Sequence, residues 1–278
     1  TNRSDDSAPP LSRPRHSLSV DISVVPGLSL RGAGGRSDVR RLSLNIIGGL
    51  HHDMHGVEAG TILNVVSGQL FGVQAAGVAN VVRGSVRGSQ FAGVMNIAMS
   101  SVDGVQVAGA VNVAGAVKGV QIAAITNVAK HVNGAQLAGA VNIASTLSGL
   151  QVGVVNVAGR SGGTQIGVFN IAARDSANAN ALGLFNFIRG GYNHLELWTS
   201  DTGVANLGVK FGGKHMYTLI MVGASEFSGD VVEFGLGWGG HFQLSNRLYI
   251  DIDALGGSRL ATNNPERIED LMVRARAT

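Results

Sequence analysis

The densest group of metal-ligand side chains in the chain is the run His51-His52-Asp53-Met54-His55. In one extended strand alternate side chains point to the same side, so His51, Asp53 and His55 would share a face. Imidazole nitrogens and a carboxylate are ligands that zinc accepts. A polar loop between two strands explains the same run without a metal. We therefore treat these three residues as the metal candidates of the chain while predicting neither a metal site nor a cofactor.

Two further patterns near the C-terminal end could carry chemistry. Asp251 and Asp253 would share a strand face, where paired carboxylates could act in acid–base chemistry or bind calcium. A solvent-facing or lumen-facing strand is the simpler explanation. Gly235-x-Gly237-x-x-Gly240 matches the dinucleotide-binding fingerprint by letter, but no helix is expected after it. Because no Ser-His-Asp arrangement, phosphate-binding loop or zinc pattern is present either, we predict no catalytic residues and a protein that is not an enzyme.

The elements that would position these residues follow from an unusual composition. Of 278 residues, 41 are glycine and none is cysteine, while 14% are charged and 45% hydrophobic. Average usage would give roughly 20 glycines and about a quarter charged residues. Such apolar content excludes disorder, and no apolar run is long enough for a transmembrane helix. The net charge of +3 is spread along the chain without a basic stripe, so no nucleic-acid partner is expected.

A tandem repeat occupies residues 56–188. Its unit reads G-x-Q-φ-A-G-φ-φ-N-φ-A, where φ is an apolar residue, and successive asparagines are 14–16 residues apart. The glutamines are Gln74, Gln90, Gln106, Gln121, Gln136, Gln151 and Gln165. The asparagines are Asn64, Asn80, Asn96, Asn112, Asn127, Asn142, Asn156, Asn170 and Asn186. Recurring glycine and β-branched residues favour strands over helices, so the repeat predicts stacked β-units.

Two all-β architectures compete for this repeat. In a β-solenoid each unit is one coil, and the amides of identical residues stack in hydrogen-bonded ladders. In one continuous antiparallel outer-membrane β-barrel, each unit is a strand and a turn. The Gln–Asn separation is six residues in early units and five from Gln151 to Asn156, a change that would flip one side chain in a straight strand. A corner of small residues between the two strands tolerates it, so we favour the solenoid.

Charge is nearly absent from the expected strands of the repeat. Between residues 104 and 173 only Lys118, Lys130 and Arg160 are charged, and all three fall between one asparagine and the next glutamine. The strand faces are therefore aliphatic on one side and Gln, Ala and Asn on the other. This pattern indicates that lipid, a fibre contact or a partner covers part of the surface.

The chain divides by pattern into four parts. Residues 1–17 read as a flexible tail, residues 18–55 as N-terminal strands forming a cap, and residues 56–188 as the repeat array. Residues 189–278 contain longer alternating runs with both tryptophans and all three tyrosines, which predicts an antiparallel β-meander. Its last alternating stretch stops without a turn, so we expect that the native chain could extend beyond Thr278.

The units GVQVAGAVNVA, GVQIAAITNVA and AQLAGAVNIA resemble a family of bacterial surface-repeat proteins of unassigned function, over about residues 18–255. The resemblance implies export to the outer membrane, cell surface or periplasm, and it brings no catalytic residues. We therefore expect a non-enzymatic structural or interaction protein of the bacterial envelope, which offers a rigid repeat surface to other envelope proteins or to copies of itself. The alternative is a porin-like outer-membrane β-barrel channel, with outer-membrane lipid as its partner.

Overall fold

The computed structural model describes residues 20–25, 28–29, 39–174, 176, 178–199, 204–224, 231–245, 248–261 and 268–277. Every regular element in these ranges is a β-strand, which confirms the predicted all-β class. The expected tail, residues 1–17, lies outside the described residues, as does part of the expected cap.

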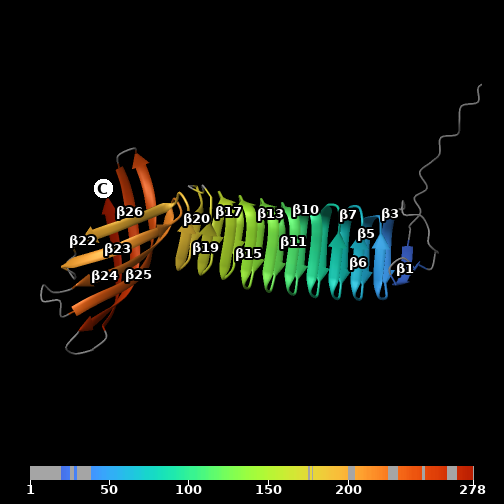
Figure 1. The fold of residues 1–278 in the computed structure, drawn as a ribbon, viewed down its shortest axis with the longest axis horizontal. Coiled ribbons are helices and arrows are strands. Elements are labelled where there is room, and N and C mark those ends of the chain that lie inside the picture. Colours follow the sequence, from blue (N-terminus) through green and yellow to red (C-terminus); the bar gives the residue numbers. More distant parts are fainter. Residues whose placement is uncertain are drawn as a thin grey trace, which may run out of the picture.

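The repeat array forms a rod of stacked coils (Figure 1). Each regular coil contains one strand with an asparagine and one with a glutamine, and in β10 the two are continuous. The rod begins with β1 (Val20–Val25), β2 (Leu28–Ser29), β3 (Val39–Asn45), β4 (Gly48–His51), β5 (Asp53–Gly60) and β6 (Leu63–Val66). It continues with β7 (Leu70–Ala76), β8 (Ala79–Val82), β9 (Val86–Ala92), β10 (Met95–Ala108), β11 (Val111–Val117), β12 (Val120–Ala123), β13 (Thr126–Val132) and β14 (Ala135–Ala138). It ends with β15 (Val141–Leu147), β16 (Leu150–Val152), β17 (Val155–Ser161), β18 (Thr164–Ile166), β19 (Phe169–Ala172), β20 (Asn180–Leu182) and β21 (Phe185–Ile188).

Neighbouring coils pair through parallel strands that keep identical residues in register. Asn112 of β11 pairs with Asn96 of β10 on one side and with Asn127 of β13 on the other. Gln121 of β12 pairs with Gln106 of β10 in the same way. Parallel pairing between successive coils confirms the predicted solenoid. The alternative of one continuous antiparallel barrel is wrong, because a meander would reverse the direction of each successive strand.

A change in coil length is absorbed at the corner between the two strands. Gln136 and Asn142 are six residues apart, whereas Gln151 and Asn156 are five apart. All four side chains nevertheless point inward. The lost residue lies at the corner, since β16 has three residues where β14 has four. A straight strand would have turned one amide outward, so the corner preserves both ladders.

Glycine lets the coils approach closely at a second corner. Gly56, Gly72, Gly88 and Gly104 adopt φ values between 134° and 147°, which L side chains rarely adopt. A Cβ atom on Gly104 would overlap the carbonyl oxygen of Gly88 in the preceding coil. Part of the glycine excess is therefore a direct requirement of stacking.

Aliphatic side chains fill the remaining interior of the rod as two further ladders. These side chains are fully or almost fully buried. One ladder is Met54, Leu70, Val86, Val102, Val117, Val132 and Leu147, and the other is Val66, Val82, Ala98, Ala114, Ala129, Ala144 and Ala158. Burial of this aliphatic surface adds hydrophobic stabilisation to the backbone pairing of the coils.

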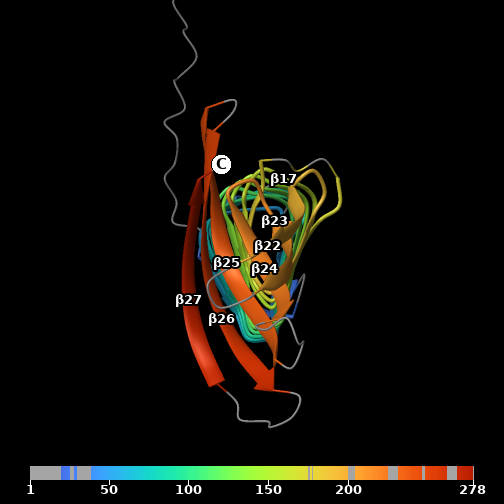
Figure 2. The same cartoon turned by 90° about the vertical axis from the view of Figure 1, so that its left-hand side faces the viewer.

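A six-stranded antiparallel sheet follows the rod and confirms the predicted meander. Its strands, in spatial and chain order, are β22 (Tyr192–Trp198), β23 (Ala205–Gly212), β24 (Met216–Ala224), β25 (Val231–Ser245), β26 (Leu248–Ala261) and β27 (Ile268–Ala277). The sheet lies across one end of the rod, and the coils appear behind it as nested ovals (Figure 2). Thr218 and Trp238 tie it to the last coil by donating hydrogen bonds to the carbonyl oxygen of Gly183.

Candidate functional site

The seven glutamines of the repeat form one continuous amide ladder inside the rod. Every one of these side chains is fully buried. Each Nε2 donates to the side-chain oxygen of the preceding coil at 2.8–2.9 Å. In the later coils the same nitrogen approaches a backbone carbonyl as well, as Gln151 does with Val157 at 3.4 Å. The donor side of the Gln ladder thus points toward the N-terminal end of the rod.

The nine asparagines form a second buried ladder of opposite direction. From Asn64 to Asn170 each Nδ2 donates to Oδ1 of the following coil at 2.8–3.1 Å. Its other N–H reaches a backbone carbonyl of the following coil, as from Asn112 to Ile122 at 2.7 Å. Flipping an Asn amide would place its Oδ1 against the backbone carbonyl oxygen, and two acceptors repel each other. The backbone carbonyl therefore sets the direction of the ladder. Because the two ladders run in opposite directions, their amide dipoles oppose each other along the rod.

The ends of the two ladders are built from different residues. At the N-terminal end Glu58 occupies the Gln position, and its carboxylate accepts from Gln74 and Asn45, both at 2.9 Å. At the other end Ala181 follows Gln165 in register, which leaves Gln165 Oε1 buried without a partner among the described residues. The Asn ladder instead continues into the C-terminal sheet.

That continuation is a hydrogen bond from Asn186 Nδ2 to Thr218 Oγ1 of β24, at 2.7 Å. Thr218 and Glu58 were missed by sequence reasoning. Glu58 had a signal, because stepping back one 16-residue unit from Gln74 reaches it. Thr218 had none, since it lies outside the repeat and joins it only through the fold.

With the amides inside, aliphatic side chains cover two outer flanks of the rod. We define the Asn flank as the outward side chains of residues 62–66, 78–82, 94–98, 110–114, 125–129, 140–144, 154–158, 168–172 and 184–188. We define the Gln flank as the side chains immediately before and after each of the seven glutamines. Ile125 and Ile143 of the Asn flank are 52% and 39% exposed, and Leu137 of the Gln flank is 37% exposed. Neither flank carries a charged residue.

The exposed charges of the array gather on a third side, which we call the polar edge. It lies between the end of each Asn segment, as defined above, and the glutamine that follows. Arg87 of this edge lies over the ring of Phe71, with Cζ 5.3 Å from the ring centroid. The members of the polar edge are Arg83, Arg87, Asp103, Lys118, Lys130, His131, Arg160 and Arg174. Six of these described members are Arg or Lys and one is Asp, so the described part of this edge is basic.

The three metal candidates do not converge. His51 faces the interior, and its Nε2 lies 3.3 Å from Glu58 Oε1. Asp53 accepts from a backbone N–H of the next coil at 2.6 Å, and His55 is exposed. The assumption of one straight strand is wrong, because a bend at His52 separates β4 from β5. Among the described residues no group of three such ligands is close enough to hold a metal ion.

Asp251 and Asp253 do share a face of β26, but that face is buried against a lysine. Lys210 Nζ lies 2.9 Å from Asp251 Oδ2, 3.5 Å from Asp253 Oδ2 and 3.0 Å from Glu196 Oε1. His241 Nδ1 lies 2.7 Å from Asp251 Oδ1. Tyr217 donates to Asp253, and Tyr192 donates to Asp251 at 3.2 Å. We call these seven side chains the Lys210 cluster.

The electrostatics of the Lys210 cluster follow from burial and pairing. Burial raises the pKa of the Asp251 carboxyl, but hydrogen bonds from Lys210 and His241 outweigh burial and hold that pKa below its ordinary value. Burial and the hydrogen bond to Asp253 raise the pKa of the Tyr217 phenol far above its ordinary value. Tyr217 therefore remains a proton donor to a carboxylate. The cluster can hold the sheet together as an ion-paired network. Because Asp251 and Asp253 are buried, the interpretation of a solvent-facing or lumen-facing strand is wrong.

The glycines at 235, 237 and 240 lie within the single strand β25, so the strand–turn–helix context of a dinucleotide site does not form. Packing explains two of them: a Cβ on Gly235 would meet the Met221 side chain, and one on Gly237 the backbone of Ala254.

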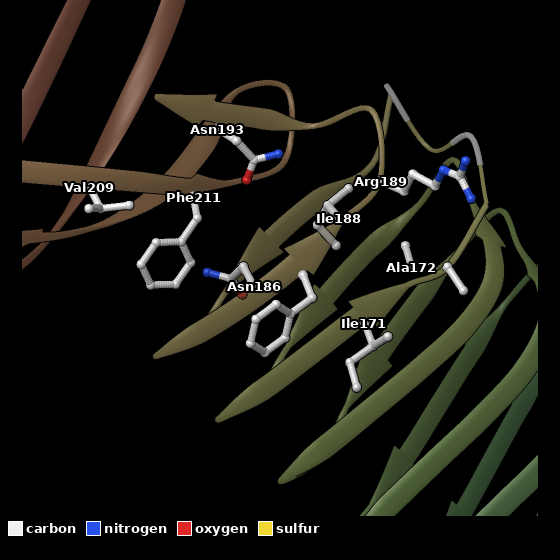
Figure 3. Close-up of a pocket in the computed structure, with 10 residues that line it drawn as sticks. Ile171, Ala172, Asn186, Ile188, Arg189, Asn193, Val209 and Phe211 are labelled. Carbon is white, nitrogen blue, oxygen red and sulfur yellow. The ribbon is translucent and has the colours of Figure 1, made fainter. Parts of the chain in front are cut away.

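An apolar cavity of about 550 Å³ lies where the rod meets the sheet (Figure 3). Ile171 and Phe187 of the Asn flank line one side, and Val209 and Phe211 of β23 line the other. The cavity is open to the surface and continues the Asn flank onto the sheet.

No helix among the described residues is long and apolar enough to cross a membrane. No protein-family model matches the sequence, and neither a curated protein nor a solved structure is significantly similar to it.

Proposed function

We propose that the protein is a non-enzymatic structural or interaction protein of the bacterial envelope, and that its rod offers a rigid surface to a partner. The observation that carries this proposal is the inverted distribution of polarity in the rod. Sixteen Gln and Asn side chains of the repeat are buried, while the Val, Ile, Leu and Phe side chains that alternate with them cover the outside. Monomeric proteins rarely expose continuous apolar patches of this kind unless something covers them.

The rigidity of the surface follows from the bonds between coils. Each step from coil to coil combines parallel backbone pairing on two strands with amide bonds from two ladders. Outward side chains are therefore held at the strand spacing of about 4.8 Å along the rod. The resemblance of the repeat to bacterial surface-repeat proteins supports the envelope setting.

Cell fractionation tests the proposal. Cells of the bacterium that encodes the chain are broken, and the protein is traced by antibody in the envelope and soluble fractions. We expect the wild-type protein in the envelope fraction, and a double variant with lysine on both flanks, Ile143→Lys and Leu137→Lys, to shift toward the soluble fraction. A wild-type protein that is wholly in the soluble fraction would contradict the proposal.

A second candidate function is lipid contact through the C-terminal sheet. One face of this sheet carries the buried Lys210 cluster, and the other exposes Leu195, Leu197 and Phe234 by 70%, 77% and 54%. Acyl chains are one environment that suits such an apolar face. Flotation of the purified protein with phospholipid vesicles tests this function, and we expect Leu197→Asp to float less than wild type while Leu137→Asp floats equally. Absence of wild-type protein from the vesicle layer would exclude it.

A further inference from the structure

We propose that the Asn flank is the contact surface between two copies of this chain. The proposal rests on the function proposed above and names the partner and the surface. Three positions of the Asn segments point outward: two before, one before and one after the asparagine. Ala79 is the single buried side chain among them. Across nine segments, Thr126 is the single polar residue at these positions, and no charged residue occurs in any segment.

The Asn flank suits a flat contact better than the Gln flank. Each Asn segment has three outward positions, whereas the Gln flank has two per coil, one on each side of the glutamine. The Gln flank also contains Ser89 and Thr164 among its outward side chains. Parallel sheets in proteins are almost always covered on both faces. The strands that contain the asparagines form one parallel sheet of the rod, and one face of this sheet packs on the rod interior. Among the described residues, no further layer covers its other face from β6 to β17.

A second copy is the occupant whose shape matches this flank. Outward side chains recur at the strand spacing of about 4.8 Å, and β-branched residues dominate the rungs. Only a surface with the same spacing can place its own rows of side chains between the rows of the Asn flank over its whole length. Such interdigitation of identical aliphatic rungs makes dry and closely packed sheet contacts. Another copy of the rod has this spacing because its coils are paired in the same way.

The area of the flank is sufficient for a pair. The eight levels from Asn64 to Asn170 span about 35 Å and five residues span about 16 Å, which gives a footprint of about 560 Å² per copy. Corrugation of the side chains raises the accessible area above this flat value. Two copies would thus bury slightly more than 1,100 Å² together, near the lower limit of roughly 1,200 Å² for specific interfaces. We therefore expect a reversible dimer with an affinity in the micromolar range.

The charges of the rod permit this contact. The exposed charged residues of the array that the structure describes all lie on the polar edge, so face-to-face packing of two Asn flanks need not bury one of these charges unpaired. At the C-terminal end the flank reaches the cavity at Ile171 and Val209, where the sheet begins (Figure 3). The contact therefore extends along the coils up to this cavity.

Sedimentation velocity of the purified full chain over a concentration series tests the proposal with a matched pair of variants. Ile143 on the Asn flank and Leu137 on the Gln flank are 39% and 37% exposed and lie in one coil. We expect wild type and Leu137→Lys to shift from monomer to dimer between about 1 and 100 µM, and Ile143→Lys to remain a monomer. Far-UV circular dichroism checks that both variants fold.

Cysteine cross-linking gives a second measurement that does not depend on a disruptive variant. The chain has no cysteine, so Val128→Cys on the Asn flank and Ile122→Cys on the Gln flank each provide one thiol. We expect oxidation to link Val128→Cys into a dimer and to leave Ile122→Cys mostly unlinked. Equal linking of both variants would overturn the proposal.

The remaining outcomes separate this proposal from the proposed function. A wild-type monomer at all concentrations overturns the dimer, and retention of that protein in the envelope fraction would still support the envelope function. A dimer that stays in the soluble fraction would support this inference and contradict the envelope function. A monomer whose Asn flank instead mediates vesicle binding would assign the flank to lipid and overturn the dimer.

Discussion

Replacing Asn112 with aspartate puts a carboxylate in the middle of the Asn ladder with almost no change in size. Asn112 is fully buried, and its Nδ2 donates to Asn127 Oδ1 at 3.0 Å and to the Ile122 carbonyl at 2.7 Å. Its Oδ1 accepts from Asn96 Nδ2 at 3.0 Å. Aspartate keeps the acceptor and loses both donors. Asn127 Oδ1 and the Ile122 carbonyl oxygen would then face a carboxylate oxygen in place of an N–H group.

The expected cost follows from these lost bonds. Each buried acceptor that loses its donor costs about 1–3 kcal/mol. An uncompensated buried charge costs about 3–5 kcal/mol in comparable cases. The new carboxyl escapes part of this cost by protonation, so we expect a loss of about 3–5 kcal/mol in the free energy of unfolding at pH 7. For a chain of this size the melting temperature would fall by roughly 10 °C.

The matched control is Asn133→Asp, which adds the same charge at an exposed position of the following coil. Far-UV circular dichroism during heating reports mainly the rod, while fluorescence of Trp198 and Trp238 reports the C-terminal sheet. Burial raises the folded pKa of the new carboxyl at 112, so its destabilisation is present above the unfolded value of about 3.9 and is relieved as pH falls toward it. Equal melting of the two variants at pH 7 would refute stacked and buried amide ladders.

Three further predictions concern the corners and the C-terminal sheet. Gly104→Ala should cost about 2–4 kcal/mol, because its φ of 146° and the overlap with the preceding coil both oppose a Cβ, whereas Gly162→Ala, with nothing within 4 Å of its Cβ, should melt like wild type. Lys210→Met should cost about 3–5 kcal/mol by leaving buried carboxylates without their lysine, and the exposed Lys214→Met should cost little in urea unfolding followed by tryptophan fluorescence. Because pairing lowers the pKa of Asp251 below its unfolded value, its contribution to stability is present above about pH 4 and is lost as pH falls through the folded pKa. We therefore expect acid titration to loosen the sheet, and a wild-type sheet whose stability is constant between pH 5 and pH 2 would contradict this expectation. The glycine prediction would be contradicted by a loss of stability in Gly162→Ala equal to that in Gly104→Ala.

Much of the rod could be predicted because its contacts repeat at the spacing of the sequence. Each Gln and Asn recurs after 14–16 residues, and in a solenoid this distance along the chain is also the path to the next coil. The shorter Gln–Asn spacing at Gln151 could likewise be read from the repeat, and it indicated a corner between the two residues. The metal candidates failed because periodicity cannot show a bend such as the one at His52, which directs His51 inward and leaves His55 outside.

The C-terminal sheet shows the limit of prediction from pattern. Its strands could be recognised by alternation, and Asp251 and Asp253 were correctly expected to share a face. Their partners could not be predicted, since Lys210 is 41 residues from Asp251 and no repeat links the two. Which buried groups neutralise one another depends on how strands from distant parts of the chain are brought together.

The sequence by itself determined the all-β class, the coil length, the corners and the identity of the residues that stack. These features are local or periodic, so each follows from residue type and spacing. The tertiary structure alone decided the opposed directions of the two ladders, because Asn amides meet backbone carbonyls of the next coil while the Gln ladder ends on Glu58. It also decided that aliphatic side chains form the outside of the rod. Alternation separates two faces of a strand, but only the closure of the coil decides which of them is buried.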